Sequence, residues 1–455
     1  MNPSSSHMKA RIVVAPLERL RRLRIGRRTV APDLPERDLA QVVHQLDALL
    51  LEPDVGPARA EVAALAGVYA SLDPVGRERF WGTVVQHFGA DPRAVDQAVA
   101  AWSAATDDVA RRDAAGALRS AAIPGYVRLL RLFTGLDDGV KLLVDLRADL
   151  RTLPSVTTEL RELDEELSRH LEGLFTVSLL ELRRITWESP AALLEKLISY
   201  EAVHAIVSWA DLKNRLASDR RCYALFHPAM PNEPLVFVEI ALTKGMAAQL
   251  APLLDEDAPL LDVDQADTAN FYSITSCQPG LKGVNLGNEL LGGVVEQLSE
   301  HLPGVRTYVT LSPIPGFRRW LTQQLAADGL TSRERAVLPP VDELREMVEA
   351  DSWLEDDARA AALRKGVTAL CARYLTSTRP DGRVLDPVAN FHLTNGAEIR
   401  RLNWLANPGP EGRRESLGLM VNYGYVPERI AANAAAYGRH RRVATSDAVR
   451  HNLLT

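Results

Sequence analysis

The sequence predicts an α+β protein, with an all-helical N-terminal domain over residues 1–172 and a mixed α/β domain over residues 173–455 that contains a helical insertion. Three observations predict this class. A helical repeat of apolar residues runs from about residue 34 to residue 172, short apolar and β-branched runs follow residue 175, and a helical repeat returns over residues 332–375. The length of 455 residues also exceeds one typical hydrophobic core, so two domains are expected.

The N-terminal segments each carry one apolar helical face. The segment SVTTELRELDEELSRHLEGLF has Ser155 at the expected N-cap and Glu159 close to the position of a capping box. In the segment DLAQVVHQLDALLL, apolar residues recur at the 3.6-residue period of an amphipathic helix. These residues are Leu39, Val42, Val43, Leu46, Leu49 and Leu50.

The mixed domain begins with strands. The segments CYALFHP and PLVFVEIAL are rich in apolar and β-branched residues, and the turn-forming segment AMPNEP separates them, so they predict a β-hairpin. A strand in NFYSITSC, a helix over residues 288–302 and a strand in VRTYVTLS follow. Such a strand–helix–strand unit places its two strands parallel in one sheet.

The last third of the chain returns to helix and then closes the sheet. The segment SRERAVLPPVDELREMVEADSWLEDDARAAALRKGVTALCARYL predicts the helical insertion, which Pro339 and Pro340 interrupt. The segment DPVANFHLTNGAEIRRLNWLAN alternates weakly between apolar and polar residues and contains the turn dipeptide Asn395-Gly396. We therefore expect it to supply the closing strands.

The composition limits the partners. Hydrophobic content of 46% and charged content of 25% are average for folded globular proteins. A net charge of -6 excludes the basic field that holds nucleic acid, so no nucleic-acid partner is expected. No apolar run reaches the ~18 residues of a spanning helix, so no membrane partner is expected either. The histidines show no metal-ligand spacing such as HExxH, so no metal site is expected.

The cellular compartment follows from the cysteines and the N-terminus. The 3 cysteines are widely spaced and form no CxxC motif, which fits a reducing cytoplasm. The basic start MNPSSSHMKARIVVAPLERLRRLRIGRR resembles a mitochondrial transit peptide, or is a frayed tail in which SSSHM is left from cloning. A cytoplasmic protein is predicted, with mitochondrial targeting left open.

A glycine-rich segment joins the third predicted strand to its helix. Gly280, Gly283 and Gly287 lie where backbone amides and the helix N-terminus suit a diphosphate. The segment is neither a Walker A loop nor a G-x-G-x-x-G dinucleotide fingerprint. A tight turn without a ligand is the alternative interpretation of the same glycines.

Longer motifs around this loop are more specific. The loop LKGVNLG resembles the pyrophosphate loop of the GNAT acyl-CoA fold. Together with HPAMPNEPLVFVEIALTKG, FYSITSCQPGLKGVNLGNELL, LSPIPGFRRWL and DPVANFHLTNGAEIRRLNWLAN, it resembles the malonyl-CoA decarboxylase family. The resemblance covers most of the chain after about Thr176 and, more loosely, the helices before it. It implies a helical N-terminal domain and a GNAT-like catalytic domain.

The resemblance also implies site residues. Ser312 and His392 match the catalytic pair of the family, and Tyr425 matches a tyrosine near its site. Taken alone, Ser312 reads as a turn serine and His392 as a core histidine. Asn285 departs from the animal members, which carry an acidic residue there. The residues that match the malonyl-CoA-binding loop are Lys282, Gly283, Val284, Asn285, Leu286, Gly287 and Asn288.

The implied reaction converts malonyl-CoA to acetyl-CoA and CO₂. No cofactor is expected, because the thioester carbonyl accepts the electron pair as an enolate. His392 would protonate the α-carbon, and Ser312 would hydrogen-bond the malonyl carboxylate or accept a proton. The family forms homo-oligomers, so a dimer or tetramer is expected. The alternatives are a GNAT-fold acyltransferase, which needs an acceptor and a base, and a non-catalytic acyl-CoA-binding sensor.

Overall fold

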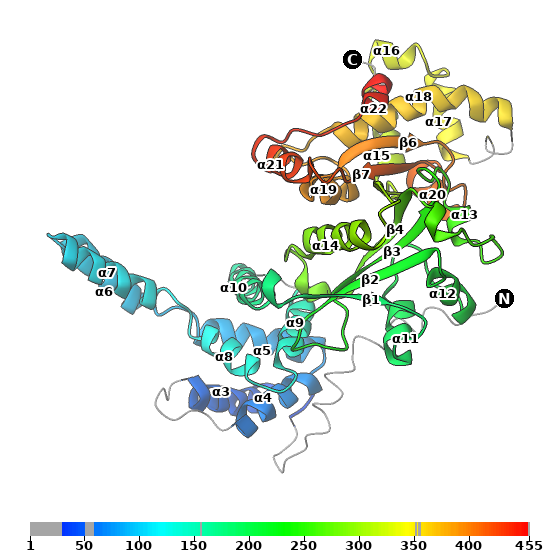
Figure 1. Ribbon diagram of the computed structural model, residues 1–455. Helices are drawn as coiled ribbons and strands as arrows, with labels where there is room; N and C mark the ends of the chain where they lie inside the picture. The colour runs from blue at the N-terminus through cyan, green and yellow to red at the C-terminus, as the bar shows by residue number, and fades with distance from the viewer. Residues whose placement is uncertain (1–29, 51–58, 155–156, 351–352, 354–355, 454–455) are drawn as a thin grey trace. The chain divides into compact units, whose positions relative to one another are not determined.

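The computed structural model describes residues 30–50, 59–154, 157–350, 353 and 356–453 (Figure 1). These residues form two compact units. Unit 1 comprises the described residues up to Glu181 together with Phe226–Leu235 and Cys277–Val284, and unit 2 comprises Leu182–Leu225, Val236–Ser276 and the described residues from Asn285 onward. The boundary at residues 172/173 stays a prediction, and the basic N-terminal segment lies outside the described residues.

Unit 1 is helical, as the periodicity predicted. The first described helix buries Val42, Leu46 and Leu49 of the predicted apolar face. Aspartate caps followed by proline begin two of the helices, at Asp73 and Asp91. The helices are α3 (Glu36–Leu50), α4 (Arg59–Ser71), α5 (Pro74–His87), α6 (Pro92–Ala104), α7 (Asp108–Ala121), α8 (Tyr126–Thr134), α9 (Gly139–Leu150) and α10 (Thr158–Leu174).

The start of α10 differs from the prediction. Thr157 is the N-cap, and its side chain accepts a hydrogen bond from the backbone amide of Leu160. The cap predicted at Ser155 lies outside the described residues. Glu159 is therefore in the first turn rather than at the third position that a capping box requires.

In the described part of the chain, unit 2 is built on one seven-stranded sheet in the order β1-β2-β3-β4-β5-β7-β6. The hairpin is confirmed, because β2 and β3 pair antiparallel, and the strand–helix–strand unit is confirmed, because β4 and β5 pair parallel with α14 between them in sequence. The strands are β1 (Glu181–Ile185), β2 (Arg220–Phe226), β3 (Val236–Thr243), β4 (Thr268–Ser276), β5 (Thr307–Thr310), β6 (Glu398–Asn403) and β7 (Met420–Gly424).

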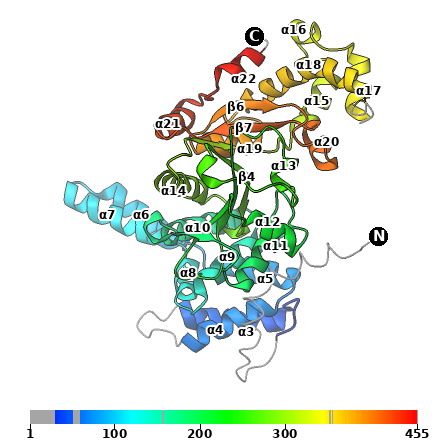
Figure 2. The same ribbon diagram turned by 45° about the vertical axis from the view of Figure 1, so that its right-hand side comes forward.

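Helices α14 and α19 lie next to each other in both ribbon views (Figures 1 and 2). The other helices of unit 2 connect or flank the strands. The helices are α11 (Ala191–Tyr200), α12 (Trp209–Arg215), α13 (Ala251–Leu254), α14 (Leu286–His301), α15 (Phe317–Ala326), α16 (Ser332–Arg335), α17 (Val341–Glu349), α18 (Asp357–Thr376), α19 (Pro387–Thr394), α20 (Pro410–Ser416), α21 (Ile430–His440) and α22 (Asp447–Asn452).

The helical insertion is confirmed as α16, α17 and α18, with α17 beginning directly after Pro340. The prediction that the segment DPVANFHLTNGAEIRRLNWLAN supplies the closing strands is partly wrong. Only Glu398–Asn403 of that segment is a strand, whereas Pro387–Thr394 is helix α19. The helix forms because Asp386 caps it by accepting from the amide of Ala389, and Pro387 stands at its first position.

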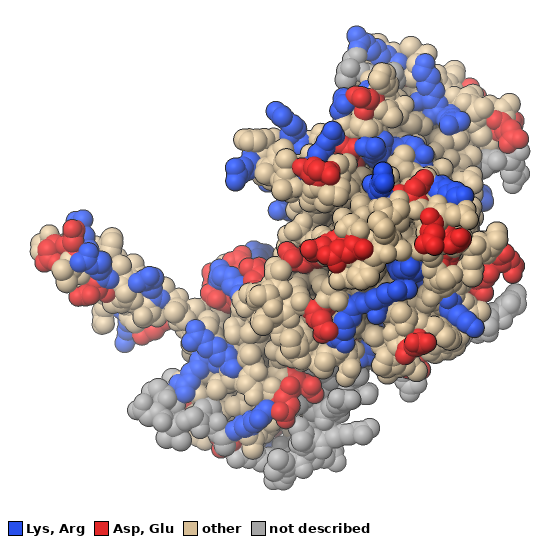
Figure 3. Space-filling model, viewed as in Figure 1, with Lys and Arg blue, Asp and Glu red and all other residues tan. Residues whose placement is uncertain are grey.

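The surface and the helices bear on the predicted partners. Lys and Arg side chains are interspersed with Asp and Glu side chains on the face of Figure 3. Within the described residues, no helix is long and apolar enough to cross a membrane. The 3 cysteines, all in the described part of the chain, are buried and form no disulfide.

Candidate active site

Ser312 is fixed by the end of the sheet. It follows β5 by two residues, and its backbone pairs with Val421 of β7 through hydrogen bonds of 2.8 Å and 3.0 Å. Its side chain is buried, and its Oγ donates to Oγ1 of Thr310 at 2.8 Å. The serine therefore lies at the carboxyl end of a strand, where ligands of open α/β sheets collect.

His392 lies on α19, in the last turn of that helix. Its imidazole stacks on the ring of Tyr423, with ring centroids 4.4 Å apart and an interplanar angle of 24°. The side chain is 3% exposed, and both ring nitrogens have a hydrogen-bond partner. The cap and proline that start the helix thus determine where this imidazole stands.

A chain of hydrogen bonds joins three predicted site residues. The hydroxyl of Tyr425 lies 2.7 Å from Nδ1 of His392, and Oγ of Ser312 lies 3.1 Å from Nε2. One placement of protons satisfies every contact. Tyr425 donates to Nδ1, the Nε2–H of His392 donates to Ser312, and Ser312 donates to Thr310. Ser312, His392 and Tyr425 are therefore brought together as the resemblance implied.

Burial sets the protonation states of the side chains in this hydrogen-bond chain. It lowers the pKa of His392 to about 3, so the imidazole is neutral near pH 7. It also raises the pKa of the Tyr425 hydroxyl well above the usual value, so the phenol keeps its proton. The sequence predicts His392 as a proton donor, and a histidine with an ordinary pKa of about 6.5 would supply that proton more readily near pH 7 than this buried imidazole does. His392 therefore cannot act as a charged proton donor near pH 7 unless a bound group stabilises its imidazolium.

A cavity of about 240 Å³ opens beside the hydrogen-bonded side chains of Ser312 and His392. Its volume is below the 300–1,000 Å³ of typical small-molecule sites, which suits the reacting end of a ligand rather than a whole coenzyme. The lining residues are Val203, Phe271, Tyr272, Ser273, Ile274, Ser276, Ser312, Pro313, Pro387, Val388, Phe391 and His392.

The glycine loop leads directly into α14. A short 3₁₀ turn, Pro279–Leu281, precedes it, and Gly283 adopts φ of 102°, a conformation that favours glycine. Asn285 is the N-cap, but its side chain accepts no capping hydrogen bond. Helix α14 begins at Leu286, two residues earlier than predicted. Among the described residues, none accepts a hydrogen bond from the first-turn amides of Leu286–Asn288.

The residues of the predicted loop fall in both compact units. Lys282, Gly283 and Val284 belong to unit 1, whereas the residues from Asn285 onward belong to unit 2. In unit 1, the guanidinium of Arg147 on α9 donates to the carbonyls of Gly280 and Lys282, both at 2.8 Å. This arginine was missed, since it lies 133 and 135 residues from its partners in sequence.

Gly287 has a packing reason to be glycine. A Cβ at this position would lie 2.5 Å from the ring of Phe391 and 2.9 Å from Nδ2 of Asn395. Both neighbours stand at or beside α19, the helix that carries His392. The first turn of α14 therefore packs directly against α19, and any larger residue would separate them.

Two segments of the chain match known protein-family domains by sequence. Residues 178–455 match the malonyl-CoA decarboxylase C-terminal domain, and residues 88–175 match the malonyl-CoA decarboxylase N-terminal domain. The chain belongs to the malonyl-CoA decarboxylase family. As a member of this family it is an enzyme of the carboxy-lyase class. The resemblance inferred from the four motifs is thereby confirmed.

Individual malonyl-CoA decarboxylases are similar over nearly the whole chain. The mitochondrial enzyme of Anser anser anser is 35% identical over 419 residues, which cover 86% of this chain and 83% of that protein. The crystal structure of the enzyme from Rhodopseudomonas palustris is 38% identical with a TM-score of 0.83, covering 90% of this chain and 99% of that one. The structure from Agrobacterium vitis is 37% identical with a TM-score of 0.84, covering 91% and 100%. These comparisons and the described elements confirm the α+β class.

Two neighbours of the predicted site residues were missed in the sequence. Thr310 accepts from Ser312, and the ring of Tyr423 packs on His392. Each lies two residues before a predicted residue, Ser312 and Tyr425 respectively. Because side chains two apart share one face of a strand, the period of two was the signal that could have identified both.

Proposed function

We propose that this chain decarboxylates malonyl-CoA to acetyl-CoA and CO₂, with Ser312, His392 and Tyr425 as its working side chains. The observation that carries the proposal is the buried hydrogen-bond chain from Tyr425 through His392 to Ser312, beside a cavity of about 240 Å³. Membership of the malonyl-CoA decarboxylase family supports the substrate class.

The proposed reaction breaks the bond between the α-carbon and the malonyl carboxylate. The electron pair moves into the thioester carbonyl, so an enolate forms while CO₂ leaves. His392 then delivers a proton to the α-carbon, which yields acetyl-CoA, and a solvent proton restores the histidine. A positioned proton donor contributes on the order of 10²- to 10⁴-fold.

His392 must be charged for this step, and the substrate itself favours that charge. Burial alone holds the imidazole neutral, with a pKa of about 3. A malonyl carboxylate bound in the cavity lowers the energy of the imidazolium, because an opposite charge within ~4–6 Å raises the pKa of a histidine. Ser312 hydrogen-bonds that carboxylate in the proposal, which holds it close to Nε2.

The predicted loop, Lys282 through Asn288, is proposed to bind the diphosphate of the CoA moiety. The unpaired first-turn amides of α14 and the exposed side chain of Lys282 support this assignment. Arg147 supports it from unit 1, since its two hydrogen bonds to the carbonyls of Gly280 and Lys282 fix the backbone that precedes the loop. The side chain of Asn285 is exposed, so it replaces an acidic residue without leaving a buried amide unpaired.

One assay tests the activity. The purified chain is incubated with malonyl-CoA and no acceptor, and acetyl-CoA and CO₂ are measured. We expect both products from the wild type, and a loss of turnover on the order of 10²-fold or more in His392→Ala and Ser312→Ala. His440→Ala, which removes an exposed histidine of α21, is the matched control. Product that appears only with an acceptor would indicate an acyltransferase, and CoA binding without turnover would indicate a sensor.

The proposed homo-oligomer rests on an exposed helical hairpin of unit 1. Helix α6 buries only Ala98 and α7 only Ala114, while Trp102 and Val109 are 44% and 60% exposed. Exposed apolar residues on two packed helices are candidates for an interaction surface. We expect light scattering to report a dimer or tetramer for the wild type and a smaller species for Trp102→Glu. An unchanged mass would remove the hairpin from the interface.

The domain boundary and the compartment are proposed from the sequence. The boundary at residues 172/173 follows the end of the helical repeat, and limited proteolysis is expected to cleave near it. A cytoplasmic location fits the cysteines, while the mitochondrial names of animal relatives favour the alternative. Cell fractionation of the full-length chain decides between the two.

A further inference from the structure

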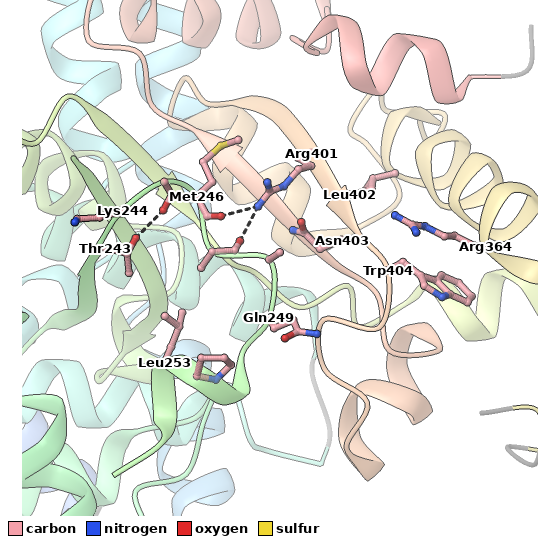
Figure 4. Close-up of a pocket in the computed structure, with 14 residues that line it drawn as sticks. Thr243, Lys244, Met246, Gln249, Leu253, Arg364, Arg401, Leu402, Asn403 and Trp404 are labelled. Carbon is pink, nitrogen blue, oxygen red and sulfur yellow. Dashed lines mark hydrogen bonds between the residues drawn. The ribbon is translucent and has the colours of Figure 1, made fainter. Parts of the chain in front are cut away.

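Unit 2 contains a second cavity, with a volume of about 520 Å³. This volume is within the 300–1,000 Å³ typical of small-molecule sites. The walls come from the end of β3 and the loop after it, from the end of β6, and from α18 (Figure 4). The cavity shares no lining residue with the one beside Ser312 and His392. It is therefore a separate site with its own chemistry.

The charged side chains of this second cavity have one sign. They are Lys244, Arg364 and Arg401, and no Asp or Glu is among the lining residues. Lys244 donates to Oε1 of Gln265 at 2.8 Å, and Figure 4 shows its ammonium pointing away from Arg401. The two guanidinium groups thus remain to interact with a ligand.

Arg401 is a half-buried cation without a counter-ion. Its Nη2 donates to the carbonyls of Met246 and Ala247, both at 2.9 Å, and its Nε donates to Oδ1 of Asn422 at 3.0 Å. None of the described carboxylates forms an ion pair with it, and none of the described acceptors binds its Nη1. Burial lowers the pKa of Arg401, which is the effect of desolvating a charge that nothing neutralises.

Arg364 adds a second cation, which is exposed to solvent. It extends from α18 toward the end of β6, beside Trp404 (Figure 4). The described part of the chain offers it neither a hydrogen bond nor an ion pair. Arg401 is half-buried without a counter-ion among the described residues, and the exposed Arg364 lines the same cavity, whose lining contains no acid. An anion is therefore the ligand that this lining favours.

We propose that this cavity binds a small organic anion, whose carboxylate or phosphate group pairs with Arg401 and Arg364. The planar guanidinium presents paired donors that match either oxyanion. Arg401 is already fixed by its three hydrogen bonds, so little further ordering is needed on binding. Met246, Leu253 and Trp404 provide apolar surface for the body of the ligand. The proposal is independent of malonyl-CoA cleavage.

Calorimetric titration tests the site on the full-length chain. The probes are succinate, as a carboxylate, and glycerol 3-phosphate, as a phosphate ester, each measured against sodium chloride at equal ionic strength. Saturating acetyl-CoA is present throughout, so that the probes do not enter the proposed active site or the diphosphate loop. Arg364→Gln and Arg401→Gln are compared with Arg439→Gln, which removes an exposed arginine of α21.

We expect saturable binding of at least one probe to the wild type, and the tighter probe identifies the head group. Loss of one charged hydrogen-bond donor should weaken that binding about tenfold in Arg364→Gln and in Arg401→Gln. Arg439→Gln should bind as the wild type does. Because Arg401 also holds the loop after β3, Arg364→Gln decides the matter if Arg401→Gln does not fold. Absence of binding by both probes, or equal affinity in Arg364→Gln and Arg439→Gln, would overturn the proposal.

Discussion

Replacing Tyr425 with phenylalanine removes one hydroxyl from the hydrogen-bond chain of the proposed active site and little else. That hydroxyl lies 2.7 Å from Nδ1 of His392. It can donate to the neutral imidazole and, after rotation of its proton, accept from the imidazolium, so it satisfies Nδ1 in both states. Phenylalanine would leave a buried N–H unpaired whenever His392 is charged. The imidazolium would then cost more free energy to form than it does in the wild type.

The magnitude follows from the lost hydrogen bond. A hydrogen bond to a charged group contributes about 1.5–3 kcal/mol, which corresponds to a roughly 10- to 150-fold loss in kcat. KM for malonyl-CoA should change little, because the hydroxyl is not among the lining residues of the cavity. Steady-state formation of acetyl-CoA from malonyl-CoA measures both constants.

The matched control stands two residues earlier on the same strand. The ring of Tyr423 packs on the same imidazole, but its buried hydroxyl has no hydrogen-bond partner among the described residues. Tyr423→Phe therefore keeps the ring contact and loses no hydrogen bond, so its kcat should stay within about threefold of the wild type. If Tyr425→Phe also stayed within threefold, or if both variants fell equally, the hydroxyl would have no part in proton delivery.

Three further predictions concern stability and binding. Burial holds His392 neutral in the folded chain, whereas the unfolded chain protonates it below about pH 6.5, so the free energy of unfolding should fall by roughly 2 kcal/mol between pH 7 and pH 5. Denaturant titrations of His392→Gln at the two pH values should lack that loss. An equal pH dependence of the free energy of unfolding in His392→Gln and the wild type would contradict the prediction. Gly287→Ala should destabilise the chain by about 1–3 kcal/mol through its clash with α19, whereas Gly292→Ala, open to solvent on the same helix, should be neutral or stabilising in thermal unfolding. Arg147→Gln should raise KM for malonyl-CoA on the order of tenfold at nearly constant kcat, while the nearby Arg151→Gln leaves KM unchanged; a fall in kcat alone would refute a loop-holding role.

Short sequence patterns predicted the helices and strands whose formation depends on neighbouring residues. The hairpin and the strand–helix–strand unit follow from short apolar runs, turn residues and a helical period, all readable within about ten residues. The segment around His392 was predicted as strand because its apolar residues alternate weakly. The cap Asp386 and the proline after it were the stronger signal, and they made an eight-residue helix instead.

The active site could not be predicted from local patterns. Ser312 and His392 are 80 residues apart, and only the fold brings Oγ to Nε2. The family resemblance named both residues, but not the protonation state of the pair. Burial by the surrounding elements sets that state, and no property of the segment ANFHLTN reveals it.

In the proposed mechanism, the low pKa of His392 keeps the imidazole from holding an extra proton before the substrate binds. A histidine that was charged in the empty cavity would meet water and exchange freely. Here burial holds the imidazole neutral, and in the proposal the substrate carboxylate is the group that stabilises the imidazolium. When the carboxylate leaves as CO₂, its negative charge passes to the enolate, which the proposal places beside the same imidazolium. Protonation is thus favoured at the moment the enolate exists, because the charge that recruited the proton has moved onto the carbon that needs it.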